Sequence, residues 1–226
     1  MVNISVIYQG GVRGMESGAH EGLARDRVLN ELRRRLIEGQ WPPDTVLQEQ
    51  DLADELRVSK TPVREALLTL SARNFVKPVM RVGYVVPHIS LGDLSEIFSI
   101  RGLVEIELVS ALAGRRHALA TKMPEDLAAW RAEYDFHEAL GAFAGGSRLR
   151  RLLGELLDET ARAMNHFRYS TEILPVVSEE HRAISAAAQQ NDISMARALM
   201  TVHLTRMRES LMASARQKLR EQNMLA

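Results

Sequence analysis

The stretch VSKTPVREAL, at Val58–Leu67, decides the fold that this sequence predicts. It places hydroxyl, basic and proline side chains in the opening turn of a helix. Ser59 or Thr61 is the expected N-cap, and Pro62 falls in the first turn, where its missing N–H group costs nothing. The helix is expected to continue to about Arg73, because its apolar residues recur on one side. These residues are Val63, Ala66, Leu67 and Leu70.

The segments on either side of this helix complete the arrangement. Apolar spacing predicts a helix over about 23–38 and a short helix over about 48–56. After the 59–73 helix, two short strands are expected around 75–79 and 84–86. A winged helix-turn-helix has this order of elements: a helix, a short helix, a further helix and a hairpin. Its last helix enters the major groove of DNA.

The crowded first turn of the 59–73 helix suits contact with DNA. A helix N-terminus offers free N–H groups and the positive end of its dipole to phosphate. The hydroxyls of Ser59 and Thr61 can bond phosphate oxygens, and Lys60 and Arg64 can reach phosphates or guanine edges. The hairpin tip at Gly83 permits a close approach to a minor groove. The alternative, ordinary surface charge, leaves the hydroxyls, the proline and the hairpin unexplained.

The runs LADELRVSKTPVREALLTL and FVKPVMRVGYVV resemble the DNA-binding domain of the GntR family of bacterial transcription regulators. The resemblance covers about residues 24–88, and it implies DNA contacts from the helix's opening turn and from the wing glycine. Gln50 stands where many members carry an arginine, and Val82 replaces a common wing-tip arginine. The predicted DNA-binding residues are Ser59, Lys60, Thr61, Arg64, Gln50, Arg81 and Gly83.

Length and composition limit the classes of protein to which this chain can belong. The chain has 226 residues, enough for one large or two modest domains, and its formal net charge is zero. It has no cysteine, which excludes disulfides, thiolate zinc sites and cysteine nucleophiles. No uninterrupted apolar run is long enough to span a bilayer, so we expect a cytoplasmic protein with no membrane partner.

Beyond a linker at about 87–90, a helical apolar period returns and persists. The predicted fold class is therefore mainly α. It comprises an N-terminal winged helix-turn-helix, with three helices and a β-hairpin wing, and an all-α antiparallel helical bundle of about six helices. The expected boundaries are a flexible N-terminal arm over 1–20, a DNA-binding domain over 21–88, and a helical effector-binding and dimerisation domain over 89–226.

Histidines interrupt the apolar stripes of the helical half. Glu133 and His137 stand four residues apart, so both project from one helix face. His181 and His203 lie on the apolar stripes of two later helices. Taken singly, each histidine fits a satisfied core or surface position. Together, three imidazoles and a carboxylate from three helices are how bundle metal sites are built, and they suit zinc, nickel, manganese or iron.

The segments EYDFHEAL, EEHRAISAA and ALMTVHL resemble the metal-bearing segments of the FCD domain, the effector-binding partner of many GntR regulators. The resemblance covers about residues 92–215 and suggests the shorter, six-helix, VanR-like subgroup. It implies a divalent metal, zinc first and nickel or manganese as alternatives, held by Glu133, His137, His181 and His203. The family's acid is usually aspartate, so the longer Glu133 is a departure.

A six-coordinate ion with these four ligands would keep positions open for a small carboxylate effector. Arg101 could clamp that carboxylate with a bidentate pair, or it could form an internal ion pair with Glu105, four residues on. Asn165 and Arg168 are further candidates for the lining of the effector cavity.

The leading hypothesis is a metabolite-responsive repressor that binds an inverted-repeat operator in double-stranded DNA as a homodimer. The serious alternative is the same regulator with a structural or absent metal and no carboxylate sensing. A metal-dependent enzyme with Glu133 as base is the rival from another class. It is disfavoured, because a winged domain would then have no purpose, and we expect no enzymatic activity.

Overall fold

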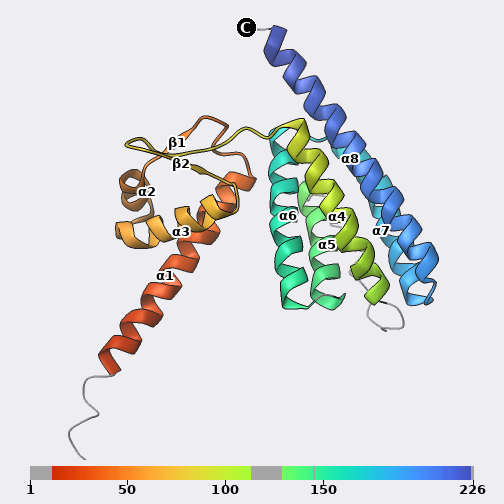
Figure 1. Ribbon diagram of the computed structural model, residues 1–226, viewed down its shortest axis with the longest axis horizontal. Coiled ribbons are helices and arrows are strands. Elements are labelled where there is room, and N and C mark those ends of the chain that lie inside the picture. The colour runs from red at the N-terminus through yellow and green to blue at the C-terminus, as the bar shows by residue number, and fades with distance from the viewer. Residues whose placement is uncertain (1–11, 113–128, 145, 225–226) are drawn as a thin grey trace, which may run out of the picture. The chain divides into compact units, whose positions relative to one another are not determined.

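The structure is a computed structural model that describes residues 12–112, 129–144 and 146–224, and it divides the chain into two compact units (Figure 1). One unit comprises Met1–Leu36 and Gln40–His88, and the other comprises Ile37–Gly39 and Ile89–Ala226. Both are built mainly from helices, as the sequence predicts. None of the helices in these described ranges combines the length and the apolar character needed to cross a lipid bilayer.

The first unit is a winged helix-turn-helix, which confirms the predicted fold. Its elements are α1 (Val12–Ile37), β1 (Val46–Leu47), α2 (Glu49–Leu56), α3 (Lys60–Ala72), β2 (Lys77–Val79) and β3 (Gly83–Val85). Helix α1 begins at Val12, so residues 12–20 of the expected arm are helical. Residues 1–11 of that arm lie outside the described residues.

The turn between α2 and α3 follows from the conformations of its residues. Arg57 ends α2 in the left-handed region, with φ of 54°, and its N–H group bonds back to the end of that helix. Ser59 is the N-cap of α3 in an extended conformation, but its side chain makes no capping hydrogen bond. The predicted apolar side of α3 is buried: Val63, Ala66, Leu67 and Leu70.

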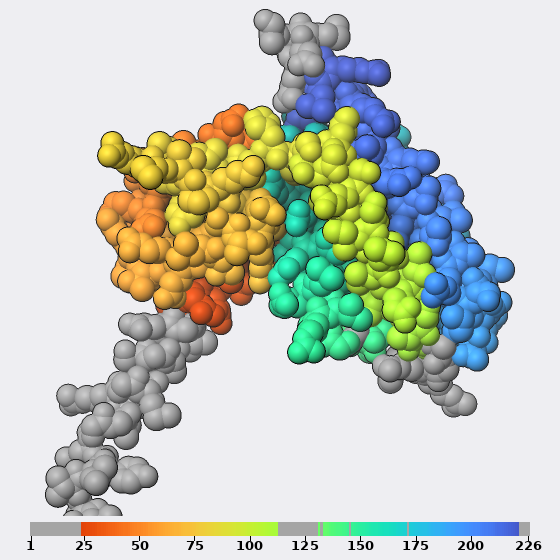
Figure 2. Space-filling view, viewed as in Figure 1, coloured from red at the N-terminus to blue at the C-terminus, as the bar shows by residue number. Residues whose placement is uncertain are grey.

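The wing is one strand wider than predicted. Strand β1 pairs with β3, so the sheet is antiparallel in the order β1-β3-β2. Gly83 begins β3 with φ of +124°, and a Cβ atom there would lie 2.6 Å from the carbonyl oxygen of Leu47. This sheet therefore requires a glycine for its own packing. The wing stands out from the rest of its unit in the space-filling view (yellow in Figure 2).

The second unit is a helical bundle. Its elements are α4 (Leu91–Ala111), α5 (Ala129–Ala144), α6 (Ser147–His166), the 3-10 turn η1 (Thr171–Ile173), α7 (Leu174–Gln189) and α8 (Ile193–Met224). The described part of this unit thus has five α-helices, against an expectation of about six. Residues 113–128 lie outside the described residues. Ser90 and Asp93 form a capping box that begins α4.

Two apolar cores fill the bundle, one toward each end. The first includes Leu108, Leu140, Leu157, Ile184 and Met200, and the second includes Leu94, Phe98, Met164, Val177 and Met207. On α7, the buried His181 lies between Val177 and Ile184, and on α8 the buried His203 lies between Met200 and Met207. Helices α4 and α8 pack directly against each other, and their atoms meet at the surface in the space-filling view (Figure 2). A polar layer therefore lies buried between two apolar cores.

Candidate metal centre and nucleic-acid interface

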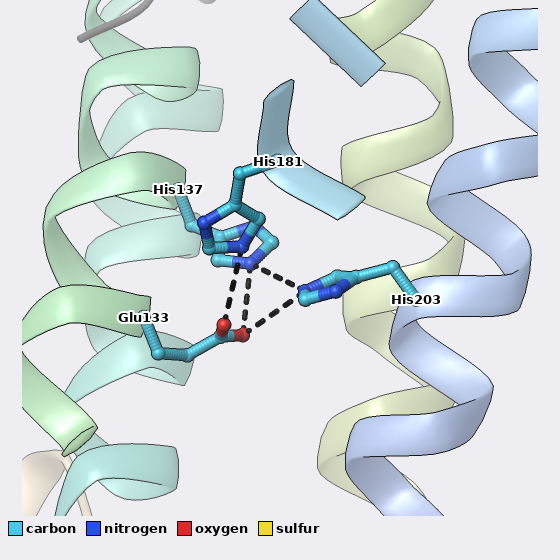
Figure 3. Close-up of side chains that lie close together, drawn as sticks. All are labelled: Glu133, His137, His181 and His203. Atoms are coloured by element: carbon cyan, nitrogen blue, oxygen red, sulfur yellow. Dashed lines mark hydrogen bonds and ion pairs between the residues drawn. The ribbon is translucent and has the colours of Figure 1, made fainter. Parts of the chain in front are cut away.

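The four side chains predicted as metal ligands lie together in this polar layer (Figure 3). Glu133 and His137 project from adjacent turns of α5, His181 from α7 and His203 from α8. All four are buried, and one ligand atom from each lies within 4.8 Å of the others. We call these four residues the Glu/His cluster. Helical spacing and the resemblance to the FCD domain together thus predicted residues that the fold brings together from three helices.

The three imidazoles turn the same ring nitrogen toward the Glu133 carboxylate. Nε2 of His137 lies 2.8 Å from Oε1, and Nε2 of His203 lies 3.4 Å from the same oxygen. Nε2 of His181 lies 3.3 Å from Oε2. The Nε2 atoms of His137 and His203 are only 3.1 Å apart, so at most one of the two can donate a hydrogen to the other.

The unsatisfied atoms of the Glu/His cluster test whether a metal fits. Both ring nitrogens of His181 and Oε2 of Glu133 are buried and make no hydrogen bond among the described residues. Although His181 lies within ion-pair distance of Glu133, burial lowers the pKa of His181 to about 4, so this ring is neutral. Buried polar atoms normally have partners, and a neutral imidazole beside a carboxylate is a typical donor set for zinc. The residues therefore fit a divalent cation.

Two further carboxylates support the imidazoles from behind. Oε2 of Glu105, on α4, contacts Nδ1 of His137. Glu180, on α7, accepts a hydrogen bond of 2.9 Å from Nδ1 of His203. A carboxylate on the far ring nitrogen fixes which nitrogen faces a metal and raises its basicity. Sequence reasoning considered Glu105 only as a partner for Arg101, and it missed Glu180.

The charge of the site favours a cation. Burial raises the pKa of Glu133, but His137 and His203 outweigh that effect and hold the pKa well below its usual range. Burial also opposes ionisation of Glu105, yet Arg101 and His137 keep the pKa of this carboxyl at about 2. Both carboxylates are therefore ionised at neutral pH, in a region that excludes water.

His203 holds a proton in this anionic setting. Burial lowers the pKa of His203, but Glu133 and Glu180 outweigh it and raise this pKa to about 9. An imidazole ligates a metal through a nitrogen that carries no proton. Cation binding at the Glu/His cluster would therefore displace a proton from His203.

The first unit presents the predicted DNA-binding residues on α2, α3 and the wing. The side chains at the start of α3 are exposed: Ser59, Lys60, Thr61 and Arg64. On α2, Gln50 is exposed and donates a hydrogen bond of 2.7 Å to Asp54. Arg81 is exposed in the turn of the wing, with φ of 63°, and Gly83 follows it. The seven residues thus lie at the helix start, the preceding helix and the hairpin, as the winged helix-turn-helix fold places them.

Comparison with protein families agrees with both units. Residues 24–86 match the family described as bacterial regulatory proteins, gntR family, and residues 96–206 match the FCD domain. This chain is a GntR-family regulator with a C-terminal FCD domain. The predicted family is therefore confirmed, and both domains are those of transcriptional regulators and not of enzymes.

Curated relatives and solved structures support the same assignment. The HTH-type transcriptional repressor GlaR of Escherichia coli is 29% identical over 195 residues, which cover 76% of this chain and 89% of GlaR. The gluconate operon transcriptional repressor of Bacillus subtilis is 38% identical over 79 residues, 35% of this chain and 32% of that protein. A GntR regulator structure from Rhodococcus sp. RHA1 has a TM-score of 0.72 at 21% identity, covering 84% of this chain and 97% of that one, which shows the shared fold.

The predicted effector residues of this GntR regulator lie in different surroundings. Arg101 is fully buried, and its Nε donates a hydrogen bond of 2.6 Å to Glu105. Its other nitrogens reach Glu133 at 3.3 Å and Thr160 at 3.4 Å. The internal ion pair considered for Arg101 is therefore present, and its contact with an effector stays a prediction.

Asn165 and Arg168 lie at the C-terminal end of α6 and just beyond it. Asn165 is half-buried, and Arg168 is exposed in the left-handed region, with φ of 53°. Among the described residues, no hydrogen bond or ion pair joins either side chain to the Glu/His cluster. Their role in binding an effector also stays a prediction.

Proposed function

We propose that this GntR-family regulator is a repressor that binds a short inverted-repeat operator in double-stranded DNA as a homodimer. The exposed hydroxyl and basic side chains at the start of α3 support the DNA-binding part of this proposal. Two of the relatives, GlaR and the gluconate operon regulator, are transcriptional repressors by name. A homodimer follows because a two-fold operator matches a two-fold protein.

We further propose that the Glu/His cluster holds a divalent metal, zinc first and nickel or manganese as alternatives. The single observation that carries this proposal is the convergence of four buried ligand atoms within 4.8 Å. Their unsatisfied nitrogen and oxygen atoms support it, because such atoms are costly to bury without a partner. When bound, the ion would supply coordination positions for an oxygen of a small carboxylate effector. The chain's own carboxylates hold the imidazoles in place for it.

The alternative function makes the metal structural or absent and assigns the bundle mainly to dimerisation. The contacts of Arg101 favour this alternative, because Glu105 and Glu133 already occupy its guanidinium. An effector carboxylate that used Arg101 would have to replace one of these buried partners. The two functions therefore differ in whether metal loss abolishes a response to small carboxylates or abolishes folding and dimerisation.

The test begins with the elemental metal content of the protein, purified without chelator or nickel resin. About one zinc, nickel or manganese ion per chain is the result expected for a site with four ligands. His181→Ala should lower this content, while His88→Ala, at an exposed position of the first unit, should leave it unchanged. Wild-type protein that folds and binds DNA without metal would contradict the metal proposal.

His181→Ala also separates the two functions. If this variant folds, dimerises and binds DNA but no longer changes its DNA affinity when small carboxylates are added, effector sensing at the metal is supported. If it loses its fold or its dimer, the structural role is supported. Circular dichroism, analytical ultracentrifugation and fluorescence anisotropy of labelled duplex DNA give the three readouts.

A further inference from the structure

Arg64 of α3 is held by a carboxylate that sequence reasoning did not consider. Glu49, the first residue of α2, accepts hydrogen bonds from Nε of Arg64 at 3.1 and 3.0 Å and from Nη2 at 2.9 Å. The two residues are fifteen positions apart in sequence and belong to the same compact unit. Their contact therefore joins the start of α2 to the exposed side of the recognition helix α3.

The geometry of the guanidinium decides what this contact leaves available. An arginine fork has one edge formed by Nε and Nη2 and a second edge formed by its two Nη groups. Oε2 of Glu49 accepts from both groups of the first edge, and Oε1 accepts from Nε as well. The second edge can donate a bidentate pair to O6 and N7 of a guanine. The Arg64 side chain is 61% exposed and that of Glu49 only 24%, so the carboxylate is the more sheltered partner and the guanidinium the more exposed.

We propose that Glu49 is a positioning residue for sequence recognition: it fixes the Arg64 guanidinium by one edge so that the other edge reads a guanine. This inference rests on the proposed function, in which α3 enters the major groove. Two physical effects support it. An arginine that is already ordered loses less side-chain entropy when it binds. The carboxylate also repels phosphate, which disfavours use of Arg64 as a mere backbone contact.

Both effects act on discrimination between sequences and not simply on affinity. Removal of any acidic charge near the DNA should strengthen binding to every duplex, because electrostatic binding is independent of sequence. Loss of the Glu49 contact should in addition weaken the preference for the operator. The informative quantity is therefore the ratio of operator affinity to non-specific affinity at a fixed salt concentration.

The experiment uses the full-length chain and two duplexes. One duplex is enriched from a random-sequence pool by the wild-type protein, and the other is a scrambled duplex of the same length and composition. Glu49→Gln should lower the affinity ratio by roughly 2- to 12-fold, which corresponds to ordering one rotamer-rich side chain. Glu65→Gln is the matched control, because it removes the same charge from an exposed position next to Arg64. It should strengthen binding to both duplexes and leave their ratio unchanged.

A double-mutant cycle with Arg64→Lys assigns the effect to the contact itself. Lysine keeps the positive charge but has no fork, so Glu49→Gln should have no further effect on the ratio in that background. If Glu49→Gln raises operator affinity as much as Glu65→Gln does, Glu49 does not position Arg64 and the inference is overturned. The same holds if Glu49→Gln lowers the melting temperature without changing the ratio, because Glu49 then only joins two helices.

Failure of the proposed function would look different. Two results would show that α3 does not read bases: the wild-type chain enriches no sequence from the pool, or Arg64→Lys leaves the ratio of operator to non-specific affinity unchanged. Either result would contradict the DNA-recognition proposal itself. If Arg64→Lys lowers this affinity ratio but Glu49→Gln does not, α3 is still the recognition helix and only the role of Glu49 is overturned.

Discussion

Glu180 accepts a hydrogen bond from Nδ1 of His203 at 2.9 Å, and this bond leaves Nε2 of the same ring facing Glu133 and His137. Glu180 is itself held by Nε of Arg206 at 2.7 Å. Glu180 therefore fixes the orientation of the His203 ring, and Nδ1 keeps its hydrogen when Nε2 gives up its proton on binding a cation. This arrangement is the one in which an outer carboxylate strengthens a histidine ligand.

Glu180→Gln is expected to weaken zinc binding by roughly 10- to 100-fold, because the amide cannot support His203 as a carboxylate does. Competition with a chromogenic chelator measures the change in affinity. The control is Glu179→Gln, which alters the neighbouring residue, an exposed acid paired with Arg182. Equal zinc affinity in the two variants would show that Glu180 does not support the metal site.

Glu159, on α6, is expected to make the stability of the fold depend on pH. Burial raises the pKa of Glu159 from 4.5 to about 7, assisted by Asp93 and opposed by the charge of Arg162. The folded chain thus binds this proton more tightly than the unfolded chain does. The corresponding stability is fully present below pH 4.5 and is lost as the pH rises through about 7.

Glu159→Gln removes this titration. The free energy of unfolding of the wild type, relative to the variant, should therefore decrease between pH 4.5 and pH 7 and level off above it. Urea unfolding at a series of pH values measures this difference. Glu209→Gln, at an exposed position of α8, is the control for the loss of one carboxylate charge. A constant difference between wild type and Glu159→Gln would contradict the raised pKa.

Gly83→Ala should destabilise the first unit. The new Cβ atom would lie 2.6 Å from the carbonyl oxygen of Leu47, and φ of +124° is strained for alanine. The expected loss is on the order of 1–3 kcal/mol in the free energy of unfolding. Gly154→Ala is the contrasting control, because its Cβ atom meets nothing within 4 Å inside α6. That change should stabilise the chain by about 0.5–1 kcal/mol in urea unfolding, and a harmless Gly83→Ala would refute the packing argument.

The start of α3 and the pairing of the wing strands could be read from sequence, because hydroxyls, proline and β-branched residues act locally. Strand β1 could not, because two residues, Val46 and Leu47, are too few to show an alternating pattern. Its existence depends on pairing with β3, nearly forty positions later in the sequence. Pairing at that distance follows from packing of the whole unit and leaves no local signal.

The Glu/His cluster could be predicted in part from local sequence. Helical spacing places Glu133 and His137 on one face of their helix. The supporting carboxylates could not be predicted in this way. Glu180 directly precedes His181, so a helix turns it about 100° away from that histidine's direction. Its bond to His203 arises only because α7 packs on α8, and periodicity along one helix does not report on its neighbour.

Lys60 and Arg64 are expected to contribute to DNA binding in different ways, although both are exposed cations on the first turns of α3. Lys60→Ala should weaken binding to all sequences alike and reduce the dependence of log affinity on log salt by about 1, as loss of a phosphate contact does. Arg64→Ala should cost about 1–3 kcal/mol on the operator and much less on scrambled DNA. Fluorescence anisotropy with both duplexes at several salt concentrations measures both effects, and each variant is the control for the other. Unchanged operator affinity in Arg64→Ala would mean that α3 does not read bases.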